Sequence, residues 1–583
     1  MYIKEVRLGL RKLLKYMKEY KKEAFLSPFF KMVEAIFELF VPLVVAAIID
    51  NGIGRADSSY VVKMALVMFA LAAVGLVSSL TAQYFAAKAA ICFTSKVRRA
   101  LFEHIQKLSY SELDKVGTST LLTRLTSDMN QMQNGVNMVL RLFLRSPFIV
   151  FGAMIMAFTI DTRSALIFVV TIILLSAVVF GIMMVCIPLY EKIQLGVDGV
   201  LSATRENLSG ARVIRAFCNE ESELRDFEDK NAILTALQNF TGRISAMTNP
   251  LTLLIVNFAV IVLIYTGGIE VNSGLITTGE VIALYNYMSQ ILVELVKLAN
   301  LIITVTKAAA CGDRIEAVLE IEPSLTSPEE EVKGSGKYIV EFKNVGLRYR
   351  GASKDSLTGL DLKVKKGETV GVIGGTGSGK TSLVDLLARF YDATSGEILI
   401  NGVDIKEYPQ AQLRSLFGVV AQKSALFKGS IRSNIRWGKA DASDSEIMAA
   451  LDAAQAKEFV EKKEGVLDYM IEQGGKNLSG GQRQRLTIAR ALVGDPDILI
   501  LDDSSSALDF ATDAKLRKTL RNRFSDKTVF IVSQRTSSIQ HADTIVVLDD
   551  GKAVGIGKHE ELLKTCGVYK EIYDSQFKKE AVS

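Results

Sequence analysis

A glycine-rich segment in the second half of the chain has the residue types that bind phosphate groups. Residues 374–381, GGTGSGKT, fit the pattern GxxxxGK[ST] in full and lie between a β-branched apolar run and an apolar run at helical spacing. The glycines let backbone N–H groups close around phosphates, Lys380 reaches the outer phosphates, and the hydroxyl of Thr381 is a ligand for Mg²⁺. The predicted phosphate-binding residues are Gly374, Gly375, Thr376, Gly377, Ser378, Gly379, Lys380, Thr381 and Ser382.

Two adjacent carboxylates end another apolar run further along the chain. The run DILILDD, residues 497–503, is predicted to form a buried strand. Asp502 is positioned to hold Mg²⁺, and Asp503 is positioned beside the water that attacks the outer phosphate. A strand that ends in Asp is common on its own, so its pairing with the glycine loop is what predicts a nucleotide site.

The charges of the 583-residue chain are unevenly distributed. Lys, Arg, Asp and Glu account for 58 of the first 320 residues and for 75 of the remaining 263. This split excludes a uniform soluble enzyme, a disordered chain and a fibrous repeat. The net charge of +5 is spread over both halves, so no nucleic-acid partner is predicted. The five cysteines lie far apart without a CxxC pair, which predicts neither a disulfide framework nor a zinc site.

Six apolar segments in the first half are candidate membrane spans, because a helix needs about 20 mostly apolar residues to cross a bilayer. One of these segments, residues 146–160, is too short by itself and must extend past Arg145 to cross the bilayer. The first and last segments contain charged residues, which face either a partner helix or a water-filled cavity instead of lipid. The six segments are residues 24–49, 64–87, 146–160, 164–190, 244–269 and 281–303.

The positions of Lys and Arg predict the orientation of these spans. Residues 1–23 contain eight of them and the turn at residues 267–280 contains none, so both termini are expected in the cytoplasm. The polar stretches 96–136 and 191–243 have apolar residues at helical spacing, which predicts that the membrane helices continue into the cytoplasm. A Pro- and Glu-containing linker, residues 321–337, divides a membrane domain, residues 1–320, from a nucleotide-binding domain, residues 338–583.

The segment NLSGGQRQRL, residues 477–486, stands between the glycine loop and the carboxylate strand. It resembles the signature of the ATP-binding cassette (ABC) transporters. The resemblance implies that four residues at a helix start bind ATP, and that the first three of them present a serine hydroxyl and backbone N–H groups to its γ-phosphate. These residues are Ser479, Gly480, Gly481 and Gln482.

Further segments match the same family in order. Tyr349 resembles the aromatic residue that stacks on adenine, Gln422 the Q-loop glutamine that binds Mg²⁺ and the attacking water, and residues 506–509 the D-loop. Residues 113–129 and 206–231 resemble the two intracellular loops of ABC exporters. A ring packed on a sheet remains the alternative for Tyr349, and an ordinary surface loop remains the alternative for Gln422.

The resemblance covers nearly the whole chain and implies an exporter half-transporter. Its expected fold is an α-helical polytopic membrane domain of six transmembrane helices with long cytoplasmic extensions, followed by an α/β P-loop ATPase domain with a helical signature subdomain. It implies ATP-driven export of a small molecule, lipid or peptide across the plasma membrane, with ATP and Mg²⁺ as cofactors. Two chains form the working unit of the family, and each ATP lies between the P-loop of one chain and the signature of the other.

Two residues depart from the family pattern. Asp503 stands where the family has its catalytic glutamate, and Gln534 stands where it has its switch histidine. Asp is one methylene shorter than Glu, and an amide cannot carry the charge or proton of an imidazole. We therefore expect that the chain's own site binds ATP but hydrolyses it poorly, while its intact signature completes a competent site on a different partner chain. Such asymmetry resembles bacterial heterodimeric multidrug-type exporters; the alternatives are a slow homodimer and an ATP-gated regulator or channel.

Polar residues inside the predicted spans leave the cargo open. Arg141 and Arg145 either line a cargo path or snorkel to the membrane interface. Asn249, Asn257, Tyr285 and Asn286 either touch cargo or form hydrogen bonds between helices.

Overall fold

The computed structural model describes residues 12–504 and 507–577 and divides into two compact units. Of the described residues, the first unit comprises 12–106 and 117–321. The second comprises 107–116, 322–504 and 507–577.

Long apolar helical segments make up the first unit, as predicted. Each of the six segments found within the described residues contains one of the six predicted spans, which confirms the predicted polytopic membrane domain. Their bounds are Leu14–Ile53, Ser58–Ile105, Thr118–Ile160, Thr162–Ser209, Glu220–Asn272 and Thr278–Leu319.

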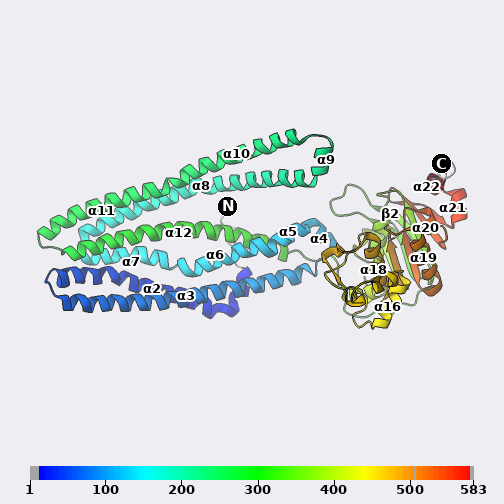
Figure 1. Cartoon of the computed structure of the whole chain (residues 1–583), viewed down its shortest axis with the longest axis horizontal. Coiled ribbons are helices and arrows are strands. Elements are labelled where there is room, and N and C mark those ends of the chain that lie inside the picture. The colour runs from blue at the N-terminus through cyan, green and yellow to red at the C-terminus, as the bar shows by residue number, and fades with distance from the viewer. Residues whose placement is uncertain (1–11, 505–506, 578–583) are drawn as a thin grey trace. The chain divides into compact units, whose positions relative to one another are not determined.

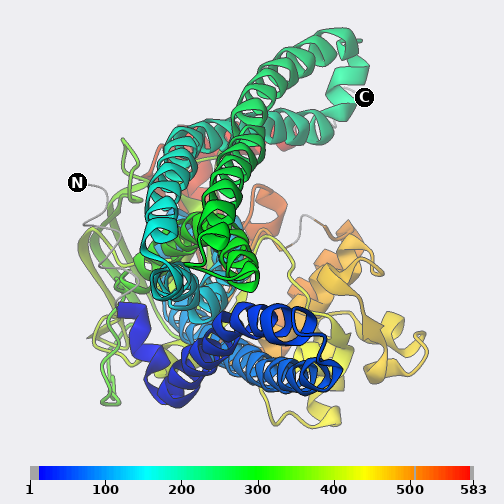
Figure 2. The ribbon, with the colours of Figure 1, turned by 90° about the vertical axis from the view of Figure 1, so that its left-hand side faces the viewer.

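Several of these helices are far longer than a bilayer is thick. The helices α3 (Ser58–Ile105) and α8 (Thr162–Ser209) have 48 residues each, which at about 1.5 Å per residue gives roughly 72 Å against a hydrocarbon core of roughly 30 Å. Figures 1 and 2 show α8 running beside α10 (Glu220–Ala246) and α11 (Thr248–Asn272), with the short α9 (Ala211–Ala216) joining α8 to α10. The helices therefore extend well beyond the membrane, as the polar stretches predicted.

Charged residues in the first and last spans pair with Arg145 at the start of α7 (Arg145–Ile160). The Arg145 guanidinium donates from Nη1 to Glu294 Oε1 of α12 (Thr278–Leu319) at 2.7 Å and from Nη2 to Glu38 Oε2 of α2 (Lys21–Ala47) at 2.6 Å. Arg145 and Glu294 are both buried. These charges thus pair between helices, and Glu34, Glu38 and Arg145 also line a cavity. The structure therefore leaves the cargo-path alternative for Arg145 open and does not support snorkelling to the interface, because carboxylates from two other helices bind its guanidinium.

The second unit contains two main sheets. A four-stranded antiparallel sheet has the order β2-β1-β4-β5, and a six-stranded sheet has the order β12-β11-β3-β10-β9-β6. In the second sheet β11, β3, β10, β9 and β6 are parallel neighbours, and β12 pairs antiparallel with β11. The strand bounds are β1 Val340–Leu347, β2 Leu357–Val364, β3 Thr369–Gly374, β4 Ser395–Ile400, β5 Val403–Asp404, β6 Phe417–Val420, β9 Ile498–Asp502, β10 Thr528–Val532, β11 Thr544–Asp549 and β12 Lys552–Gly557.

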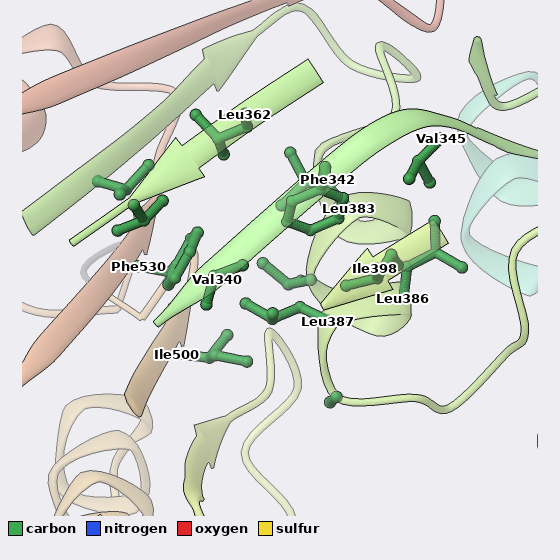
Figure 3. Close-up of a cluster of buried hydrophobic side chains, with 14 of the residues drawn as sticks. Val340, Phe342, Val345, Leu362, Leu383, Leu386, Leu387, Ile398, Ile500 and Phe530 are labelled. Carbon is green, nitrogen blue, oxygen red and sulfur yellow. The ribbon is translucent and has the colours of Figure 1, made fainter. Parts of the chain in front are cut away.

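The helix that follows the glycine loop is packed between these sheets. One face of α13 (Lys380–Leu387) buries Leu383, Leu386 and Leu387 completely, and each such side chain contributes about 1.5–3 kcal/mol by leaving water. Figure 3 shows these leucines facing side chains of β1 and β4, with Ile500 and Phe530 of the parallel strands on another side of the cluster. The packing fixes α13, and with it the glycine loop, relative to the strands.

A short segment from the first half of the chain belongs to the second unit. The helix α4 (Tyr110–Val116) packs on the residues that follow α13, since the ring centroids of Tyr110 and Phe390 lie 5.0 Å apart. The Tyr391 hydroxyl also donates to Asp114 Oδ2 at 2.5 Å. The second unit therefore includes ten residues, 107–116, that precede the predicted boundary at residue 320 by a long way.

Candidate functional site

Predicted site residues from four segments meet along one edge of the six-stranded sheet. The strands β6, β9, β10 and β3 are parallel neighbours, so their carboxyl ends lie side by side. The glycine loop follows β3, Gln534 follows β10, Asp502 and Asp503 stand at the end of β9, and Gln422 follows β6. Ligands bind at this edge of open α/β sheets, which makes it the candidate site.

The glycine loop has the geometry of a phosphate cradle. Gly379 has a φ of +98°, and a Cβ there would lie 2.5 Å from the carbonyl oxygen of Ser356, so only glycine fits. A Cβ at Gly375 would meet nothing within 4 Å, so the loop is open on that side. Lys380 Nζ donates to the carbonyls of Gly374 (3.0 Å) and Gly375 (2.6 Å). Burial lowers the pKa of Lys380 because it removes water from the ammonium group. A bound anion beside this group would favour its charged form and so oppose that lowering.

Asp502 and Thr381 together fit a magnesium ion. Asp502 is buried at the end of β9, where burial raises the pKa of its carboxyl and a hydrogen bond from the Thr381 side chain opposes that rise. Carboxylate and hydroxyl oxygens are the ligands that Mg²⁺ prefers. These two residues would hold the ion.

The residues that depart from the family pattern lie next to this pair. The Asp503 N–H donates to the Val532 carbonyl of β10 at 3.0 Å, which fixes Asp503 beside the strand that leads to Gln534. Burial raises the pKa of Asp503, and a hydrogen bond with the Gln422 side chain is among the effects that lower it. The side chains of Gln422 and Gln534 are both exposed at the sheet edge. The structure thus brings all three predicted catalytic residues to one edge.

Tyr349 and Ser382 contact each other. The Tyr349 hydroxyl donates to Ser382 Oγ at 3.1 Å, and the Tyr349 ring lies edge-on against Tyr391, with centroids 5.0 Å apart. Ser382 is buried, and its hydroxyl is engaged by Tyr349, so the group it offers a phosphate is its backbone N–H in the first turn of α13. Burial also raises the pKa of Tyr349.

The signature residues occupy a different part of the unit. Ser479 caps α18 (Gly480–Leu492), accepting from the Gln482 N–H at 3.2 Å, while Gln482 Oε1 accepts from the Ser479 N–H at 3.0 Å. A Cβ at Gly481 would lie 3.1 Å from the Ala507 carbonyl oxygen, so the helix start adjoins the predicted D-loop; Ser506 itself lies outside the described residues. Ser479 and Gly480 are exposed at the positive end of the helix.

Sequence reasoning missed the connection between the signature helix and the Q-loop. The Ser424 hydroxyl donates to Gln484 Oε1, and Arg490 Nη1 donates to the Ala425 carbonyl at 2.9 Å. Gln484 is buried in α18. A polar residue on the apolar face of a helix was the available signal, because a buried amide needs a partner.

A half-buried carboxyl in α13 was also missed. Burial, and then the charges of Asp502 and Asp114, raise the pKa of Asp385 to about 6. An unfolded chain loses this proton near pH 4, so the folded state becomes relatively less stable as pH rises from about 4 to about 6.

We expect Asp385→Asn to raise the unfolding temperature of the nucleotide-free and Mg²⁺-free protein at pH 7.5 and to change it much less at pH 4.5, as measured by differential scanning fluorimetry. The exposed control Asp441→Asn should show no such pH-dependent gain in unfolding temperature. An equal gain at both pH values in Asp385→Asn would contradict the prediction.

Comparison with known proteins places these features in a family. A family model described as "ABC transporter transmembrane region" matches residues 24–295, and one described as "ABC transporter" matches residues 357–506. An uncharacterized ABC transporter ATP-binding protein of Mycobacterium tuberculosis is 34% identical over 573 residues, which is 97% of each chain. An ATP-dependent lipid A-core flippase of Desulfotalea psychrophila is 34% identical over 480 residues, 82% of this chain and 84% of its own.

The likeness extends to a solved structure of the same fold. A bacterial Atm1-family ABC exporter with ATP bound superposes with a TM-score of 0.77, covering 96% of this chain and 98% of its own at 24% identity. The six apolar helices, the strand-end site and the signature helix are therefore parts of one known architecture. The chain belongs to the ABC transporters, as an exporter half-transporter in which a membrane domain and an ATP-hydrolysing domain are fused to move cargo across a membrane.

Proposed function

We propose that the chain is one half of a heterodimeric exporter whose own P-loop site binds ATP and Mg²⁺ but hydrolyses ATP slowly. The observation that carries this proposal is the pair Asp503 and Gln534, which stand together at the sheet edge beside the glycine loop. The transporter lies in the plasma membrane among its lipids, with both termini in the cytoplasm. Residues 1–320 form its membrane domain, 321–337 its linker and 338–583 its ATP-binding domain.

Each residue of the site has a defined task in this proposal. Lys380 and the N–H groups of the loop hold the phosphates, and Tyr349 stacks on adenine. Thr381, Asp502 and Gln422 hold Mg²⁺, which neutralises charge on the phosphates when bound. Asp503 is one methylene short of a glutamate, so its carboxylate falls about 1 Å short of the attacking water, and such a misplacement can cost about 100-fold in rate.

The intact signature supports the second half of the proposal. Ser479 and Gly480 are exposed, and a Cβ at Gly480 would meet nothing within 4 Å. This helix start can therefore approach the γ-phosphate held by a second chain and complete its site. A partner with glutamate and histidine at the two altered positions would then carry most of the turnover.

The cargo is a small molecule, a lipid or a peptide, and the lipid A-core flippases among the relatives favour a lipid as the first cargo to test.

The proposal predicts a gain of activity. Asp503→Glu with Gln534→His should raise ATP turnover of the transporter, purified from its host with any partner and placed in nanodiscs, because both groups of a competent site are then present. In a heterodimer whose second site already turns over at full speed, ATP turnover can rise by about twofold at most. In a homodimer, where both sites are repaired, ATP turnover should rise by about 100-fold. The exposed substitution Asp441→Glu, which also adds one methylene to an Asp, serves as the control.

Native mass spectrometry of the same sample identifies the assembly. A mass equal to this chain plus a different chain supports the heterodimer. A mass of twice this chain, or unchanged turnover in the double variant, contradicts it and leaves a slow homodimer or an ATP-gated regulator.

A further inference from the structure

We infer that Gln576, near the end of the last described helix, is a positioning residue for the switch segment, which we define as residues 533–536. Its amide donates from Nε2 to the Gln534 carbonyl at 2.7 Å. Its Oε1 accepts from the Thr536 N–H at 2.9 Å and from the Thr536 hydroxyl at 2.8 Å. One side chain thus makes three hydrogen bonds to two residues that lie 40 and 42 positions earlier.

The helix that carries Gln576 is firmly attached to the sheet. Tyr569 of α22 (Gly567–Phe577) is completely buried in an apolar cluster with Ile539, and Ile572 packs against the same cluster. Positions 569, 572 and 576 share one face of a helix. The Tyr569 hydroxyl is also hydrogen-bonded to His559 Nδ1 at 2.7 Å. Two apolar side chains therefore fix α22, and the amide on the same face reaches the switch segment.

The switch segment depends on this amide. Thr536 is completely buried and begins the short helix α20 (Thr536–Ile539), so its N–H has no acceptor within that helix. Gln576 supplies the acceptor, and Ser533 Oγ accepts from the Arg535 N–H at 3.0 Å. The backbone on both sides of Gln534 is thereby fixed, while the Gln534 side chain stays exposed.

A fixed backbone with a free side chain suits a residue that must reach a ligand. This inference rests on the nucleotide site proposed above, and it adds that the Gln534 amide donates to the outer phosphate of ATP on the neighbouring loop. Removing the Gln576 amide leaves the buried Thr536 N–H and hydroxyl without their acceptor, so the segment must shift to find another. A hydrogen bond to a charged group is worth roughly tenfold in binding, and the shift would forfeit it.

Photolabelling with an azido-ATP probe and Mg²⁺ tests the inference on the full transporter at low temperature, where hydrolysis is slow. Gln576→Ala should raise the probe concentration for half-maximal labelling of this chain about tenfold and leave that of a partner chain unchanged. Gln576→Glu keeps the acceptor for Thr536 but loses the donor to Gln534, so its shift should be smaller. Ser575→Ala, next to it on an exposed position of α22, is the matched control and should change nothing.

Hydrogen exchange provides a second measurement on the same variants. In Gln576→Ala the Thr536 amide should exchange at least about tenfold faster, while amides of the buried strands β3 and β10 keep their protection. Unchanged labelling in Gln576→Ala overturns the inference. The variant Gln534→Ala then tells which idea failed. If it raises the probe concentration for half-maximal labelling, the role of Gln534 is supported; if it does not, that role is contradicted as well. Equal shifts in the Ala and Glu variants, with lost protection throughout the sheet, mean a purely structural role and also overturn the inference.

Discussion

Gly480→Asp should lower ATP turnover of the assembled transporter by about 100-fold or more. A Cβ at this position meets nothing within 4 Å, so the chain accommodates the new side chain without repacking. The carboxylate would stand at the start of α18, where the γ-phosphate held by the second chain is proposed to dock. Repulsion between the two negative charges would keep the second site open and prevent hydrolysis there. Phosphate release in nanodiscs measures the effect.

Two controls separate this effect from others. Asn522→Asp adds the same charge at an exposed position of α19 (Phe510–Arg523) and should leave turnover unchanged. Lys380→Ala disables the chain's own P-loop site, which is proposed to be slow, and should cost no more than about tenfold. Equal losses in Gly480→Asp and Lys380→Ala would contradict the asymmetry of the two sites.

Arg145→Met should destabilise the membrane domain by about 3–5 kcal/mol. The substitution removes the guanidinium that bonds Glu294 at 2.7 Å and Glu38 at 2.6 Å, and Glu294 is only 3% exposed. Ser146 and Lys297 still donate to Glu294, but a buried carboxylate that loses its main cationic partner remains costly. A thiol-reactive dye measures the unfolding temperature through the buried Cys186 and Cys311, in a chain whose Cys92, Cys218 and Cys566 are replaced by Ser.

The chain offers a matched exposed pair. Arg225→Met breaks a bond of 2.6 Å to Glu221, where both side chains are more than two-thirds exposed, and should change stability by less than about 1 kcal/mol. Adding Glu294→Gln to Arg145→Met removes the stranded charge and should restore much of the loss. If the double variant is no more stable than the single one, packing of the Arg145 stem rather than charge explains the effect.

The parts of the structure that depend on local spacing were predictable from the sequence. The six spans follow from the length of their apolar runs, and the confirmed α/β ATPase fold follows from strand, loop and helix patterns around residues 374–381. Predicting that the strand-end residues lie close together required one more step, the rule that the carboxyl ends of parallel strands lie at one edge of the sheet. The roles of these residues stay predictions, but their proximity follows from the order of the strands.

The contacts that join distant segments were not predictable. Arg145 finds its partners 107 and 149 positions away, on α2 and α12, so spacing alone left a cargo path and snorkelling as equal choices. Gln576 lies 42 positions from the residue whose carbonyl it binds, in a helix that looks like any amphipathic C-terminal helix. Side-chain pairing of this kind depends on packing, which a single sequence does not encode in any short pattern.

The helix α4 imposes an order on biosynthesis. The segment 107–116, which contains α4, leaves the ribosome long before Phe390 and Tyr391, against which it packs in the second unit. Domains generally fold as units during synthesis, so this unit completes its packing only when its later residues meet a segment that was made before them. A fragment that starts at residue 338 lacks α4 and exposes the parts of Phe390 and Tyr391 that α4 covers, although both rings keep their packing on the core of this unit. Folding of the second unit thus depends on a segment that lies, in the sequence, between two of the membrane helices.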